Sequence, residues 1–231
     1  MVGMKRTLFV ALAIGALAPA AKAEEFFFDN YCSMGSFQVC ASVRLFSDGN
    51  TLRMQVWNLE GTLGVQHTMT SIGLYHSGAP WTGTVTSYSV THDGNDITSY
   101  WTPGGASDIG TLAGIELELA EGTGGNSGIV GCTTPGGGTK WNTCQSFDSQ
   151  PYVEFTFNLT ENFALDGTEL RWHSQQLPDD SSIKCDTGGA GDYAPCLPNT
   201  SVPEPTTMIL LGTGLAGLAG ARRRRKQASG V

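Results

Sequence analysis

The chain has 231 residues, 40% of them hydrophobic, and a formal net charge of -8. This length suits one domain, and the acidic charge excludes nucleic acid as a favoured partner, because phosphates repel an acidic surface. Residues 24–201 hold 20 of the 21 acidic residues but only five of the 13 basic ones, which gives this middle part a net charge of -15. The remaining basic residues lie in the two terminal segments, so these segments are expected to serve a different purpose.

Residues 1–23 have the layout of a secretory signal peptide. Two basic residues precede an apolar run over residues 8–18, and Ala21 and Ala23 form a small-x-small cleavage pattern. A retained membrane anchor is the alternative, but this run is shorter than the roughly 20 residues that span a bilayer. We therefore predict export by the Sec machinery and cleavage by signal peptidase after Ala23.

A second apolar segment, residues 208–221, contains no charge and is followed by a basic cluster. A helix over residues 206–221 can cross a bilayer if the arginines reach up to the headgroups, and we predict one short transmembrane helix there. The basic tail then stays in the cytoplasm by the positive-inside rule, and the acidic middle lies across the inner membrane. This tail consists of Arg222, Arg223, Arg224, Arg225 and Lys226.

Val202, Pro203, Glu204 and Pro205 come just before this helix. The two prolines hold the stretch extended, because each fixes φ and restricts the residue before it. Residues 202–226 resemble the PEP-CTERM sorting signal of Gram-negative bacteria, which combines Pro-Glu-Pro, a short hydrophobic helix and an arginine cluster. The resemblance implies that exosortase, a membrane cysteine protease-transpeptidase, recognises the segment and cleaves near Pro-Glu-Pro. An ordinary tail anchor with a chance Pro-Glu-Pro is the alternative.

Six cysteines fall into three close pairs: Cys32 with Cys40, Cys132 with Cys144, and Cys185 with Cys196. An even number in an exported chain predicts disulfides, and pairing between neighbours is the simplest arrangement. A metal site would need C-x-x-C or Cys/His clusters, which the sequence lacks. Cys40 falls inside an expected strand, so a buried thiol or a different partner is the alternative for that residue.

The middle part alternates between apolar and polar residues with a period of two and lacks a long helical pattern. Turn residues at 47–50 and 93–95 separate neighbouring runs. Strands are expected over residues 37–46, 51–59, 69–76, 84–91, 97–101, 115–119, 152–160 and 168–175. Strands with one apolar face bury these faces against one another in two packed antiparallel sheets. We therefore predict an all-β, jelly-roll-like β-sandwich over residues 24–177, followed by a Cys-containing loop and linker over residues 178–201.

The four histidines, His67, His76, His92 and His173, have no zinc-site spacing. His76 and His173 follow aromatic residues on expected strands, and we expect both to face solvent. No catalytic residue and no metal ligand is predicted from the histidines.

Two further patterns have a structural and a functional interpretation. Glu116 and Glu118 point the same way from one strand, as glycosidase carboxylates do, but alternating glutamates are typical of a solvated strand face. The segments 48–50 and 93–96 offer oxygen ligands for Ca²⁺, yet Asp, Gly and Asn are also the usual turn residues. We expect a solvated face and two turns, and keep Ca²⁺ as the alternative at the turns.

Five tryptophans are numerous for a domain of this size: Trp57, Trp81, Trp101, Trp141 and Trp172. Exposed aromatic rings on a β-sandwich can stack on sugar rings. Trp57 falls on the polar phase of its strand, opposite Met54 and Val56, and is therefore a candidate glycan contact. Burial under a neighbouring loop is the alternative for this ring.

These patterns lead to one expected function and two alternatives. The expected function is that of an exported, non-enzymatic surface or extracellular matrix protein, held briefly in the inner membrane and then processed by exosortase. Exosortase systems are associated with exopolysaccharide and biofilm production, so the resemblance implies a polysaccharide partner. The first alternative is a carbohydrate-binding module, and the second is a secreted hydrolase, for which the sequence offers no catalytic motif.

Overall fold

The computed structural model describes residues 23–34, 37–59, 65–76, 78, 80–103, 114–119, 127–131, 139–143, 151–177, 179, 181–189 and 193–198. The predicted signal peptide up to residue 22, the pair Cys132 and Cys144, and the predicted sorting segment lie outside these residues. Within the described ranges, no helix is long and apolar enough to cross a bilayer. The transmembrane helix expected over residues 206–221 also falls outside them.

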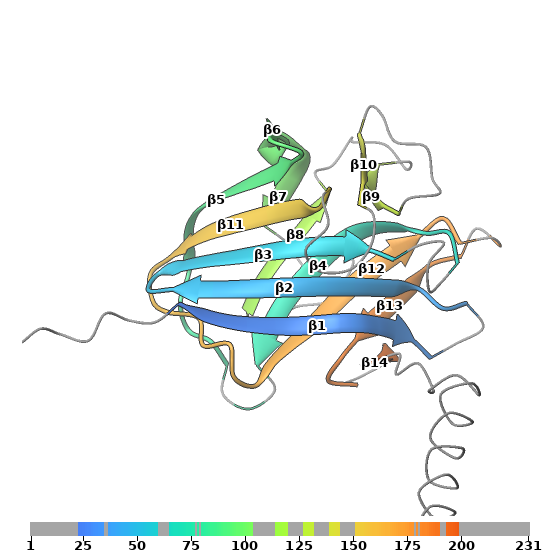
Figure 1. Ribbon diagram of the computed structural model, residues 1–231. Coiled ribbons are helices and arrows are strands. Elements are labelled where there is room, and N and C mark those ends of the chain that lie inside the picture. Colours follow the sequence, from blue (N-terminus) through green and yellow to red (C-terminus); the bar gives the residue numbers. More distant parts are fainter. Residues whose placement is uncertain are drawn as a thin grey trace, which may run out of the picture.

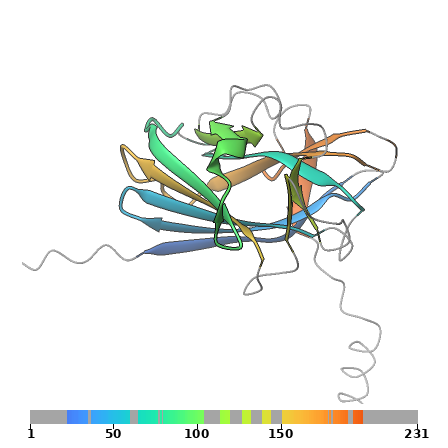
Figure 2. The same cartoon turned by 90° about the horizontal axis from the view of Figure 1, so that it is seen from above.

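The described chain is nearly all β, with fourteen strands in one continuous hydrogen-bonded sheet that folds into two facing layers (Figures 1 and 2). The first layer contains, in spatial order, β14 (Ala194–Pro198), β1 (Glu24–Ser33), β2 (Cys40–Asp48), β3 (Thr51–Asn58), β11 (Val153–Leu159), β5 (Val85–His92) and β6 (Asn95–Asp96). Neighbours within this layer are antiparallel.

The second layer is centred on β4 and β12, which pair along their whole length. It contains β13 (Ile183–Asp186), β12 (Thr168–Gln175), β4 (Thr68–His76), β8 (Gly114–Leu119), β7 (Trp101–Pro103), β9 (Gly128–Val130) and β10 (Lys140–Asn142). Strands β8 and β9 lie one after the other along the edge of β4 that faces away from β12. The pairs β9–β10 and β13–β14 are parallel, and the prediction of an all-β, mainly antiparallel domain is confirmed.

Apolar side chains of the two layers meet in one core. Met54 and Phe155 from the first layer belong to the same buried cluster as Ile72 and Trp172 from the second. Strand β11 shows the predicted alternation, because its apolar residues are buried and the polar residues between them are at least partly accessible. The period-two pattern therefore identified the face of this strand that builds the core.

The two turns that were possible Ca²⁺ sites have backbone conformations that account for their sequences. Asp48 pairs with Thr51, which leaves a two-residue loop whose first residue, Gly49, has φ 57°. In the β5–β6 turn both Asp93 (φ 49°) and Gly94 (φ 75°) are left-handed. Glycine and aspartate are favoured in such hairpin turns because they tolerate positive φ.

The expectation of a loop and linker over residues 178–201 is wrong for Ile183–Asp186 and Ala194–Pro198, which are strands. Strand β13 pairs with β12, and β14 pairs in parallel with β13 and antiparallel with β1, so these two strands join the layers at one side of the sheet. Strand β1 was not predicted, although it pairs with β2 over most of its length. The segment 97–101, expected as a strand, contains a 3-10 turn, η1 (Thr98–Tyr100), before β7 begins.

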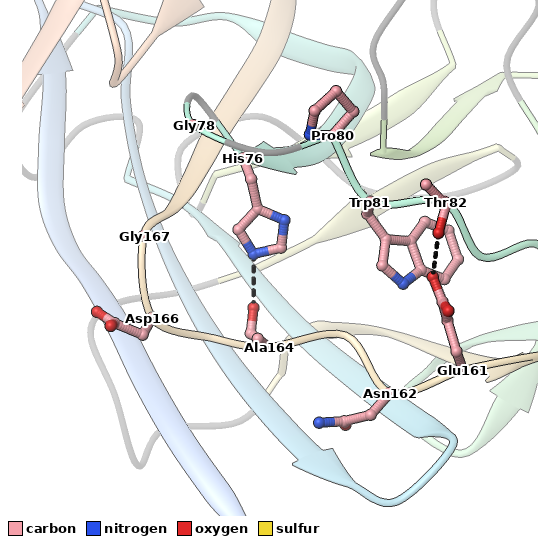
Figure 3. A pocket seen from close by; sticks show the side chains of 10 residues that line it. All are labelled: His76, Gly78, Pro80, Trp81, Thr82, Glu161, Asn162, Ala164, Asp166 and Gly167. Carbon is pink, nitrogen blue, oxygen red and sulfur yellow. Dashed lines mark hydrogen bonds between the residues drawn. The ribbon is translucent and has the colours of Figure 1, made fainter.

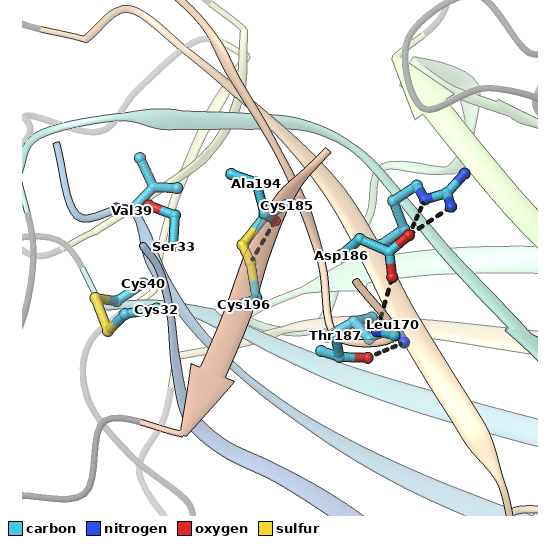
Figure 4. The surroundings of a disulfide bond; sticks show 12 residues. Cys32, Ser33, Val39, Cys40, Leu170, Cys185, Asp186, Thr187, Ala194 and Cys196 are labelled. Atoms are coloured by element: carbon cyan, nitrogen blue, oxygen red, sulfur yellow. Dashed lines mark hydrogen bonds and ion pairs between the residues drawn. A yellow bond between two sulfur atoms is a disulfide. The ribbon is translucent and has the colours of Figure 1, made fainter. Parts of the chain in front are cut away.

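Two of the predicted disulfides are present. Cys32 and Cys40 occupy directly paired positions of β1 and β2, with Cα atoms 4.1 Å apart, so the alternative of a buried thiol at Cys40 is wrong. Cys185 and Cys196 join β13 to β14, with Cα atoms 5.6 Å apart (Figure 4). Each bond therefore links two neighbouring strands at the side of the sheet where the two layers meet.

Candidate functional site

A cavity of about 500 Å³ lies at one end of the two layers (Figure 3). One wall comes from the segment after β4, and the other comes from the connection between β11 and β12. The lining residues are His76, Gly78, Pro80, Trp81, Thr82, Glu161, Asn162, Ala164, Asp166 and Gly167. This volume falls within the range of about 300–1,000 Å³ that is usual for small-ligand sites.

His76, the last residue of β4, is fixed between the two walls. Its Nε2 lies 2.8 Å from the carbonyl oxygen of Ala164, so this nitrogen carries the proton and donates it. The ring also stacks on Phe163, with ring centroids 4.7 Å apart. The other ring nitrogen, Nδ1, lies on the side of the ring that faces Trp81 (Figure 3). His76 is half-buried, which agrees only in part with the expected solvent-facing position.

Trp81 belongs to the segment after β4, lies across the cavity from His76 (Figure 3) and is half-buried. The edge of Phe163 meets its ring at a centroid distance of 5.6 Å. The ring also lies against Gly83, where an added Cβ would collide with it and with the side chain of Glu161. Glycine at position 83 therefore allows the tryptophan and the glutamate to approach each other. The indole N–H is buried and makes no hydrogen bond to the described residues.

The polar groups of the cavity come mainly from the β11–β12 connection. Glu161 accepts a hydrogen bond from Thr82 at 2.9 Å, which ties the two walls together. Asn162 accepts a bond from Ser47 through its Oδ1 atom at 2.8 Å, so its amide nitrogen is the group left to donate. Asp166 is exposed. The lining therefore has two carboxylates and no lysine or arginine, and it is unsuited to an anionic ligand.

A second polar cluster lies on the outer face of the second layer, around Arg171 and Asp186. The guanidinium donates to the carboxylate from Nε at 2.8 Å and also from Nη2. Tyr75 donates its hydroxyl to the same carboxylate, and the backbone N–H of Gly188 does so at 2.8 Å. The guanidinium also lies over the ring of Tyr193, 4.0 Å from its centroid.

This cluster is buried, with Asp186 0% and Arg171 7% exposed. Burial, together with the carboxylates of Asp186 and Glu169, raises the pKa of Tyr75 well above its usual value of about 10. Because no ligand can reach these groups without displacing the fold, we interpret the cluster as structural. It holds β13 and the following turn onto β12.

The prediction that Trp57 contacts a glycan is wrong, because the ring is only 1% exposed. Its outward-facing position on β3 is covered by the Cys32–Cys40 disulfide and by Tyr152, whose ring meets the indole edge-on at 5.4 Å. The alternative stated from the sequence, a buried ring, is therefore what the structure has. Trp81 is the tryptophan that lines the cavity, and nothing in its local sequence distinguished it.

The histidines also differ from expectation. His173 is only 4% exposed and lies 3.3 Å from the hydroxyl of Thr70, so the prediction of a solvent-facing side chain is wrong. His67 is 1% exposed and contacts the amide of Asn58, and burial lowers its pKa to about 4. His92 contacts the carbonyl oxygen of Asn142 at 2.7 Å. Among the described residues, no three side chains of the metal-ligating types come together.

Glu116 and Glu118 occupy alternate positions of β8, next to Gly73 and Ser71 of β4. Both are intermediate in exposure, and neither lines the cavity. The predicted alternation of this strand is confirmed, since Ile115 and Leu117 are buried in the core.

The residues proposed for sorting, Val202 to Pro205 and the basic cluster at 222–226, lie outside the described residues. A family model of the PEP-CTERM protein-sorting motif matches residues 201–225. Searches of curated proteins and of solved structures give no match. The recognition made from the sequence is thereby confirmed, and the chain carries a PEP-CTERM protein-sorting motif, which marks it as an exported target of exosortase.

Proposed function

We propose that this protein is a non-enzymatic component of the cell surface or extracellular matrix that functions together with exopolysaccharide in a biofilm. The observation that carries the proposal is the sorting motif at residues 201–225, which indicates export and processing by exosortase. Two strand-to-strand disulfides support an oxidising, extracytoplasmic location, because such bonds rarely persist in the cytosol.

The route to the surface follows from the two ends of the sequence. A signal peptide removed after Ala23 starts export through the Sec machinery, and a helix over residues 206–221 holds the chain in the inner membrane until exosortase acts. The basic cluster at 222–226 keeps the short tail on the cytoplasmic side. The folded body fits this route because strand β14 ends at Pro198, just before the motif.

The proposal that the protein is not an enzyme rests on the chemistry of its polar groups. In the cavity, the Nε2 proton of His76 is held by the carbonyl oxygen of Ala164 and is not directed at a nucleophile. The contact between Thr70 and His173 is buried, away from any substrate. Screening the exported protein on glycan and ester substrates tests this point, and turnover above that of a mock preparation would contradict it.

A carbohydrate-binding module is the second candidate function. It is favoured by one observation, the cavity in which a half-buried tryptophan lies beside the carboxylate of Glu161. In this case the folded body, which we classify as a jelly-roll-like β-sandwich on account of its two facing layers, would contact the polysaccharide with its loops.

Replacing Glu204 by alanine tests the sorting step. We expect the full-length precursor to accumulate in the inner membrane, because the extended Pro-Glu-Pro stretch no longer fits the processing enzyme. Cell fractionation and intact mass, which also report both termini and the number of disulfides, measure the outcome. The control is Asp179→Asn, which changes an exposed carboxylate of the folded body. Normal release of the Glu204→Ala protein would count against exosortase processing.

A further inference from the structure

The cavity described above has features that select one class of ligand, and this inference rests on the proposed role at a polysaccharide matrix. We propose that the cavity lined by His76, Trp81, Glu161 and Asp166 binds a sugar residue that carries no negative charge, either a neutral pyranose or an amino sugar.

The first argument is the balance of hydrogen-bonding groups. Figure 3 shows the carboxylate of Glu161 and the Nδ1 atom of His76 on the sides that face Trp81, whereas the side chains of Asp166 and Asn162 point away from the space between His76 and Trp81. A pyranose presents several hydroxyl groups, each of which both donates and accepts. Such a ligand can donate to the Glu161 carboxylate, which accepts from Thr82 through one oxygen and keeps further lone pairs, and can also hydrogen-bond to the imidazole.

The second argument is the charge of the lining. The two carboxylates are not balanced by a lysine or arginine among the lining residues, so a uronate or sulfated sugar would be repelled. An amino group carries a positive charge and would be attracted by the same carboxylates. A divalent cation is the competing ligand, but the described residues do not gather three ligands of the usual types at this place.

The third argument is the way in which the tryptophan is held. Trp81 packs against Phe163 and Gly83, and Glu161 is tied to the opposite wall through Thr82. A preorganised aromatic ring loses little freedom on binding, and it offers an apolar surface to the C–H groups of a sugar.

The experiment uses the processed protein isolated from the cells that export it. Isothermal titration measures its affinity for three oligosaccharide probes: a neutral β-glucan, chitosan and alginate. A Ca²⁺ titration is the fourth arm. We expect the protein to bind the neutral or the amino-bearing probe and not alginate or Ca²⁺.

Three variants locate the binding. We expect Trp81→Ala to weaken the affinity for the bound probe by about tenfold or more, as truncated tryptophan hot spots do. Asp166→Asn removes one exposed carboxylate without disturbing the packing of Trp81, and we expect it to weaken chitosan binding while the melting temperature stays unchanged. The aromatic control is Phe27→Ala on β1, since this ring is 43% exposed and does not line the cavity.

The outcomes separate this inference from the proposed function. Binding of alginate or Ca²⁺ alone, no binding of any probe, or unchanged affinity in both the Trp81 and the Asp166 variants would overturn the inference. A protein that still co-sediments with the extracellular polysaccharide of its own cells would, in that case, retain its proposed role in the matrix. Absence from that matrix would overturn the proposed function itself.

Discussion

Replacing Asp186 by alanine removes the counter-charge of Arg171 from a place that water does not reach. The carboxylate accepts four hydrogen bonds: two from the guanidinium, one from Tyr75 and one from the backbone of Gly188. After the substitution the guanidinium stays buried, at 7% exposure, without this partner.

The expected cost follows from that burial. Removing one partner of a buried ion pair destabilises proteins by about 3–5 kcal/mol, because the remaining charge is left without compensation. We expect a loss of about 4 kcal/mol for Asp186→Ala. This is a large part of the roughly 5–15 kcal/mol by which folded domains are stable.

Urea unfolding of the exported protein, followed by tryptophan fluorescence, measures this loss. With a slope of about 2 kcal/mol per molar urea, the midpoint should fall by about 2 M. The control is Asp179→Asn, which replaces an exposed carboxylate and should change the free energy of unfolding by less than about 0.5 kcal/mol. The double variant Arg171→Met with Asp186→Leu removes both charges and should be more stable than Asp186→Ala. A midpoint within about 0.5 M of the wild type for Asp186→Ala would refute the reasoning.

Two further predictions concern the pH dependence and the second disulfide. The folded protein keeps His67 neutral, with its pKa lowered to about 4 by burial, whereas the unfolded chain takes up the proton below about pH 6.5. Protonation of this histidine in the unfolded chain should therefore lower the free energy of unfolding by about 3 kcal/mol as the pH falls from 6.5 to 4. The urea midpoint of His67→Gln should fall less over this pH range than the midpoint of the wild type. An equal fall in both proteins would contradict the lowered pKa of His67. Replacing both Cys185 and Cys196 by alanine opens a loop with a sequence separation of 11 and should cost about 3 kcal/mol. Unchanged unfolding midpoints would show that the bond adds nothing to the packing of β13 and β14.

The sequence predicted the strands whose two faces differ. In β11 and β8 the apolar and polar residues alternate, because one face meets the core and the other does not. Strand β1 was not predicted from this alternation, because Phe26, Phe27 and Phe28 are consecutive and give no period of two. Its position is set by pairing with β2, which is a contact between segments and not a property of either one.

The segment 178–201 was misinterpreted for a related reason. Its composition of Pro, Asp, Ser and Gly is typical of loops. The short strands β13 and β14 are instead stabilised by the Cys185–Cys196 bond and by the ion pair of Asp186 with Arg171 on the neighbouring strand. Such long-range partners leave no periodic signal in a short window.

The candidate site could not be predicted from local patterns. Trp81 and Glu161 lie far apart in the chain, and they meet only because β4 and β11 end, and β12 begins, at the same side of the molecule. The error at Trp57 has the same origin. The alternation along β3 correctly predicted that this side chain points away from the core, but it could not predict the disulfide that covers the ring. The sorting motif was predictable because its three parts are contiguous in the sequence.

In the membrane-held form that we propose, the tether between the folded body and the lipid bilayer is short, because β14 belongs to the sheet. The eight residue steps from Pro198 to Thr206 reach at most about 29 Å when fully stretched. Exosortase would therefore work in a narrow gap beneath the folded body. A force on the anchored end would act first on β14. The Cys185–Cys196 bond would transmit this force to β13, so that β14 would not separate from the sheet by itself.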